Sequence, residues 1–174
     1  MKTNTIQDLG NFSGTILIPV FESEDKNSDT IVFDGLPIPS KIFSGIKDTL
    51  YLVEKNNNIH LFVGLGKTID YKGLKTIFRR IAAKQKEHFS INVALVLPEQ
   101  FTDNQVEAMI SGLLLGTYDL GHFKANKKVH PFIEPDFTLH LVSDKDHLAV
   151  AKKGIKIAKA QLAILNLVDL PSNT

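Results

Sequence analysis

The 174-residue sequence predicts an α/β protein in which helices pack on a mixed central sheet. After a β-rich first third, apolar runs typical of strands alternate with amphipathic helical segments, and this alternation is typical of parallel strands joined by helices. Two apolar runs in the middle of the chain are joined by an asparagine-rich tip, which predicts a β-hairpin. The hairpin adds an antiparallel pair, so the sheet is expected to be mixed.

The composition fits a single globular domain that is large enough to bury its own core. Apolar residues make up 43% and charged residues 22% of the chain, and the net charge of +1 argues against a dedicated nucleic-acid binder. The absence of cysteine excludes a disulfide framework and a thiolate metal site. Neither an apolar signal segment nor a run long enough to span a membrane is present, so we expect a cytoplasmic protein.

The first third of the chain is expected to contribute strands and one short helix. Residues 1–13 are polar and are expected to fray or to form a short edge element. The β-branched run Thr15–Phe21 predicts a buried strand. Residues 31–33 predict another strand before a turn at Asp34–Pro37, and Ser40 is expected to cap a short helix.

The middle of the chain carries the clearest local signals. The predicted hairpin joins Thr49–Glu54 to Ile59–Val63 through Lys55–Asn58, where asparagine tolerates left-handed backbone angles. Asp70 is expected to cap a helix with one apolar and one basic face. Thr102 and Gln105, three residues apart, predict a capping box at the start of the next helix. Further strands are expected at 91–97 and 137–142.

The last stretch, Lys145–Thr174, predicts a helix of about 22 residues, or roughly 33 Å. One apolar stripe on this helix is expected to face the core of the domain. A second apolar side consists of Val150, Ile157, Ile164 and Val168. A helix that is apolar on two sides is covered on both. It is therefore either buried in a three-layer domain or a stalk whose second side contacts another domain or subunit.

A glycine turn and a group of lysines are the candidate ligand-binding features. The candidate ligand loop is Gly64, Gly66 and Lys67, but Leu61 stands where a Walker loop requires glycine, so we favour a turn that only makes room for backbone. A candidate basic surface for nucleic acid consists of Lys152, Lys156 and Lys159 on the last helix, with Lys124, Lys127 and Lys128 before it. Such a charged seam is usually solvated. No catalytic, cofactor-binding or metal-ligating residue emerges, because the six histidines show no metal-ligand spacing and no carboxylates pair.

Three stretches, Phe62–Lys67, Gly112–Tyr118 and Leu167–Asn173, resemble in order and spacing the N-terminal domain of the leucyl (cytosol) aminopeptidases, a family of two-metal exopeptidases. The first looks like the family's Val-Gly-Leu-Gly-Lys turn and the second like its Leu-Gly-x-Tyr helix end. The third is similar to Leu-Val-Asn-x-Pro-Ser-Asn, which opens the catalytic domain. Asp169 departs from the usual asparagine, and Leu165-Asn166 replaces an Arg-Asp pair.

The resemblance implies a macro-domain-like α/β/α sandwich over residues 1–144, with residues 145–174 as a long helix and the start of an interdomain connector. The family's metal ligands and catalytic lysine lie beyond the Pro-Ser-Asn motif, so none can be assigned here. Two divalent metals, zinc or manganese, are expected in the absent catalytic domain, which is the expected partner. The resemblance also implies a homo-oligomer that releases N-terminal amino acids from peptides. ADP-ribose-type ligand binding is an alternative, because related macro domains bind that ligand at glycine-rich loops.

Overall fold

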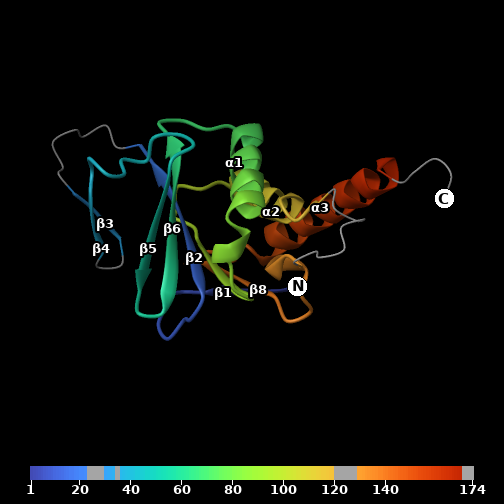
Figure 1. Cartoon of the computed structure of the whole chain (residues 1–174), viewed down its shortest axis with the longest axis horizontal. Coiled ribbons are helices and arrows are strands. Elements are labelled where there is room, and N and C mark those ends of the chain that lie inside the picture. The colour runs from blue at the N-terminus through green and yellow to red at the C-terminus, as the bar shows by residue number, and fades with distance from the viewer. Residues whose placement is uncertain (23–29, 34–35, 120–128, 170–174) are drawn as a thin grey trace.

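The computed structural model describes residues 1–22, 30–33, 36–119 and 129–169 (Figure 1). Its strands are β1 (Lys2–Ile6), β2 (Thr15–Phe21), β3 (Thr30–Phe33), β4 (Leu36–Pro39), β5 (Leu50–Lys55), β6 (Asn58–Gly66), β7 (Asn92–Val96) and β8 (Thr138–Val142). Its α-helices are α1 (Tyr71–Lys84), α2 (Asp103–Leu115) and α3 (Leu148–Val168). Single 3-10 turns occur at Lys86–His88 and Pro131–Ile133.

The main sheet has the strand order β1-β8-β7-β2-β6-β5. All neighbouring strands run parallel except β5 and β6, which form the predicted antiparallel hairpin. The polar N-terminal segment supplies the edge strand β1, with Lys2 opposite Thr138 of β8. The mixed sheet expected from the sequence is therefore confirmed.

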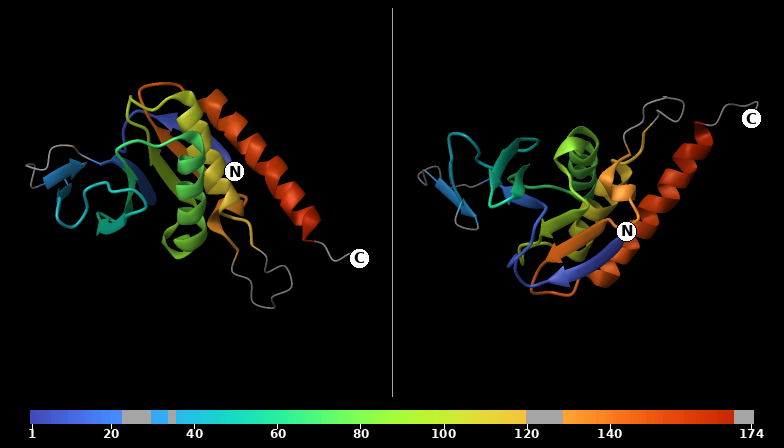
Figure 2. Two further views of the ribbon diagram at one scale, coloured as in Figure 1. Left: turned by 90° about the horizontal axis from the view of Figure 1, so that it is seen from above. Right: turned by 60° about the horizontal axis from the view of Figure 1, so that its bottom comes forward.

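The three α-helices lie side by side on one face of this sheet (Figure 2). The connections β6-α1-β7 and β7-α2-β8 both step in the same direction across the sheet, and right-handed crossovers in one direction place their helices on the same face. The opposite face is covered by the hairpin β3–β4 and by Phe43, which pack against Ile16, Ile18 and Phe62. Over the described residues the three layers are thus helices, sheet and hairpin, and the α/β class with a long C-terminal helix is confirmed.

The predicted helix caps at Asp70 and Thr102 are confirmed. The Asp70 carboxylate accepts a hydrogen bond of 2.8 Å from the backbone N–H of Gly73 at the start of α1. Thr102 and Gln105 form the reciprocal capping box of α2. Because α2 is buried along most of its length between its neighbours, glycine is needed where α1 comes closest. A Cβ added at Gly112 would lie 2.5 Å from the carbonyl oxygen of Lys75.

One expectation about a helix was wrong. The helix expected at Ser40 is absent, because Gly45 takes a φ of 77° and its carbonyl accepts a hydrogen bond from Gly66 instead of continuing a helical ladder. The last helix, expected to have about 22 residues within Lys145–Thr174, has 21 residues and begins at Leu148. The Asp146 side chain accepts from the N–H of Leu148, which holds the residues before it in a turn.

Candidate functional site

The first half of α3 is attached to the helix layer through small residues. Ala151, Gly154 and Ala158 are the buried residues of this helix. A Cβ added at Gly154 would lie 3.1 Å from the carbonyl oxygen of Glu107 on α2, so the absence of a side chain lets the two helices approach closely. The first half of α3 therefore packs closely against α2, and its fully buried residues in this contact are all small.

The second half of α3 extends beyond the rest of the domain (Figure 1). Ile164, Leu167 and Val168 are 60%, 68% and 74% exposed. The run 160–168 contains no charged residue, and within it Leu162 and Leu165 still pack against the edge of the core. We call Ile164, Leu167 and Val168 the projecting end of α3. These three side chains form an exposed apolar surface at the end of the helix.

The proposed contact surface on the second side of α3 is not uniform. Val150 and Ile157 are half-buried, and Val150 packs against the main core, whereas Ile164 and Val168 are exposed. Sequence reasoning missed Leu167, which joins the same exposed surface. Its spacing of three residues from Ile164 was the available signal. The role of this surface as an interdomain or subunit contact stays a prediction.

The three lysines of the candidate basic surface that lie on α3 are exposed. No ion pair or hydrogen bond joins Lys152, Lys156 or Lys159 to any residue that the structure describes. Lys124, Lys127 and Lys128 lie outside the described residues. Lys153, which the sequence did not single out, differs from its neighbours because its ammonium group donates to the carboxylate of Glu107 at 2.6 Å.

The glycines at the end of β6 form hydrogen bonds with neighbouring backbone. The N–H groups of Gly64 and Gly66 donate to the carbonyls of Thr49 and Gly45, at 2.9 and 2.8 Å. A Cβ at Gly64 would lie 2.0 Å from the carbonyl oxygen of Ile46, which explains why this position is glycine. Lys67 is exposed. The geometry supports the favoured interpretation, in which the glycines make room for backbone.

Burial and hydrogen bonds shift the pKa values of several titratable side chains. Burial alone would raise the pKa of Glu107, but hydrogen bonds from Lys153 and Tyr71 hold this pKa below its usual value. Burial lowers the pKa of His130, and burial also lowers that of His140. Within the described ranges no three His, Asp or Glu side chains lie close enough to hold a metal ion.

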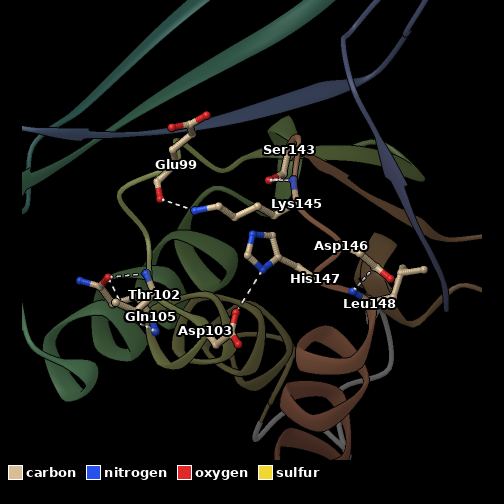
Figure 3. A network of polar contacts seen from close by, with 9 residues as sticks. All are labelled: Glu99, Thr102, Asp103, Gln105, Ser143, Lys145, Asp146, His147 and Leu148. Atoms are coloured by element: carbon tan, nitrogen blue, oxygen red, sulfur yellow. Dashed lines mark hydrogen bonds and ion pairs between the residues drawn. The ribbon is translucent and has the colours of Figure 1, made fainter.

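A polar network joins the N-terminal ends of α2 and α3 (Figure 3). The buried His147, directly before α3, has its Nδ1 atom 3.4 Å from the carboxylate of Asp103 in the first turn of α2. Nearby, the Lys145 ammonium group donates to the backbone carbonyl of Glu99 at 3.1 Å. These contacts join the segment before α3 to the start of α2 and to the residues that precede it.

The sequence is 29% identical over 143 residues to a protein of Treponema denticola described as a probable cytosol aminopeptidase. That match covers 76% of this chain and 29% of the Treponema protein. A mutant of tomato leucine aminopeptidase has the same fold, with a TM-score of 0.70 and 17% identity over 94% of this chain and 36% of the tomato chain. The resemblance to the leucyl (cytosol) aminopeptidases is confirmed.

Another solved structure agrees in fold. The bottromycin maturation enzyme BotP, in complex with manganese, gives a TM-score of 0.65 at 12% identity and covers 90% of this chain and 32% of its own. No protein-family model matches the sequence. This chain therefore spans about a third of the length of the proteins that it resembles. Among the described helices, none combines the length and apolar character needed to cross a membrane.

Proposed function

We propose that this chain is the non-catalytic N-terminal domain of a leucyl aminopeptidase-like protein and that the projecting end of α3 contacts the rest of that protein. The observation that carries the proposal is the uncharged, exposed end of α3, in a chain that spans only about a third of the length of its relatives. A helix that is apolar on all sides is normally buried. A partner of about twice the size of this chain supplies the missing cover.

In this proposal the longer protein is cytoplasmic and releases N-terminal amino acids from peptides. Two divalent metal ions, zinc or manganese, would polarise the scissile carbonyl and activate a water molecule there. The manganese in the BotP structure supports this choice of metal. The described part of the present chain offers no cluster of three ligands, so the ions belong to the other part. The role of this chain is to support assembly, including homo-oligomers, and to regulate access to the site.

The non-catalytic role is tested with purified chain and leucine p-nitroanilide in the presence of manganese. We expect no release of nitroaniline above the rate of the heat-denatured sample. An active leucine aminopeptidase in the same buffer verifies the assay. Turnover that copurifies with the folded chain would show that the domain is itself catalytic.

The contact role is tested by mixing the chain with the separately produced part of the Treponema protein that the sequence match leaves uncovered. We expect a complex by calorimetry and by gel filtration. If the chain binds neither this part nor a longer portion of a leucyl aminopeptidase, the proposed contact role of the projecting end is wrong.

The exposed Lys152, Lys156 and Lys159 favour nucleic-acid binding as a second candidate function. Phosphate contacts by these three side chains would weaken steeply as salt increases. Retention of the chain on duplex DNA at physiological ionic strength, lost on substitution of the three lysines by alanine, supports this candidate. Absence of retention at that ionic strength eliminates it.

A further inference from the structure

A buried carboxylate on α2 connects all three α-helices. Glu107 is 6% exposed, which is unusual for a charged residue. One of its oxygens accepts a hydrogen bond of 3.0 Å from the hydroxyl of Tyr71, the first residue of α1. The other accepts from the ammonium group of Lys153 on α3 at 2.6 Å. A single side chain in the middle helix is thus bonded to both of its neighbours.

A second bridge joins α1 directly to α3. The ammonium group of Lys75 donates to the side-chain carbonyl of Gln161 at 2.9 Å. Lys153 and Gln161 are eight residues apart on α3, a separation of about 12 Å along the helix axis. Two attachment points that far apart determine the direction of a rod, whereas one point does not.

The apolar contacts of α3 determine this direction only in part. Helices interlock at fixed angles when large side chains of one helix fit between those of the other. The fully buried residues of α3 are small (Ala151, Gly154 and Ala158), and its larger core-facing side chains are only partly buried (Val150, Ile155, Leu162 and Leu165). The polar bridges therefore add specific contacts that favour one orientation of α3 over a neighbouring one.

We propose that Glu107 and Lys153 form a latch that sets the direction of α3, and thereby the location of its projecting end. Both are positioning residues in this proposal. The latch is a property of this chain alone and does not depend on the proposed aminopeptidase partner. The Lys153 side chain is 65% exposed, so one side of the latch can be reached from solvent. A partner carboxylate, or any change that removes the charge of Lys153, would release it.

The effect on the projecting end is large because α3 acts as a lever. Leu167 lies 14 residues beyond Lys153, about 21 Å along the axis, so a tilt of about 10° moves it by roughly 4 Å. The chain has no cysteine, which permits specific spin labelling. Labels at Leu167→Cys on α3 and Glu54→Cys on β5, both exposed, report this movement as a distance distribution by double electron-electron resonance.

We expect one narrow distance in the parent chain and a shifted or broader distribution in Glu107→Gln and in Lys153→Met. The double variant should show no more than either single change, because both remove the same pair. Lys153→Arg should restore the parent distribution. Lys152→Met is the matched control, since it removes an adjacent exposed lysine that has no partner within the described part of the chain.

Circular dichroism verifies that each variant is folded. Lys153→Met keeps the test valid even if the buried Glu107→Gln change prevents folding, because Lys153 lies at the surface. The proposal is overturned if folded Lys153→Met gives the parent distance distribution, or if Lys152→Met changes it equally. A failure of this experiment leaves the aminopeptidase-domain proposal untouched, since that proposal rests on the similarity and on the apolar end of α3.

Discussion

Replacing Ile164 and Leu167 together by alanine should weaken the association of α3 with its partner while leaving the fold of the chain nearly intact. The two side chains are 60% and 68% exposed, so about two-thirds of each is available to a partner. Complete burial of a leucine or isoleucine side chain contributes about 1.5–3 kcal/mol. Two-thirds of that for the pair is about 2–4 kcal/mol, which corresponds to an affinity roughly 30-fold to 1000-fold lower.

The cost to folding is smaller for the same reason. The buried third of each side chain contributes about 1–2 kcal/mol for the pair, and the higher helix propensity of alanine offsets about half a kcal/mol of this. Urea unfolding of the free chain should therefore show a loss of about 1 kcal/mol. The opposite pattern, a large loss on unfolding with little change in binding, is expected for a buried position such as Ala151.

Calorimetry with the unmatched part of the Treponema protein measures the affinity. Lys152→Ala serves as the control, because this exposed lysine lies on the first half of the same helix, away from the projecting end. The reasoning is refuted if the double variant is folded and binds with the affinity of the parent chain. It is equally refuted if Lys152→Ala weakens binding as much as the double variant does.

Acidification and one glycine substitution give further expected outcomes. Burial lowers the pKa of His130 below its unfolded value, so the unfolding free energy should fall as the pH drops below about 6.5. The slope should be shallower in His130→Gln but not flat, since the lowered pKa of His140 acts in the same direction. His130→Ala should cost about 2–5 kcal/mol at pH 7.5, because the ring nitrogens bond the Ala82 carbonyl and the Phe132 N–H; a loss below about 1 kcal/mol would contradict these bonds. Gly116→Ala should cost about 1–3 kcal/mol, because its Cβ would lie 2.4 Å from that of Ala82; an unchanged melting temperature would contradict this packing.

The features that the sequence predicted correctly depend on residues close together in the chain. The Asp70 cap and the Thr102 capping box each act over three residues. The hairpin tip requires left-handed angles, and Asn56 and Asn57 adopt φ values of 52° and 62°. Local chemistry of this kind is decided before tertiary contacts form, which is why spacing alone was enough to predict it.

The features that the sequence did not predict depend on distant partners. Ser40 had the chemistry of a cap, but the following segment pairs with the turn at Gly66 and does not form a helix. The Glu107 cluster joins residues on three helices, with Tyr71 already 36 positions away from Glu107. No spacing rule selects Glu107 as the buried carboxylate. Its role follows from the burial of α2 between α1 and α3.

The second side of α3 shows how far a periodic pattern can predict a site. Periodicity identified which side of the helix is apolar, but exposure also changes along that side: Val150 is half-buried and Val168 is 74% exposed. That gradient exists because α2 ends at Leu115 while α3 continues past its last buried residue, Ala158, by ten residues.

An exposed helical end that served only as a solvated tether would gain from charged residues, which keep such helices soluble. The sequence instead places its lysines on the first half of α3, where the helix already rests on the domain, and none after Lys159. The half of α3 that carries the lysines packs on the domain, whereas the uncharged half is the one whose apolar side chains are exposed to solvent. This distribution is the reverse of a simple tether and is the one expected of a helix whose end is buried against another part of a larger protein.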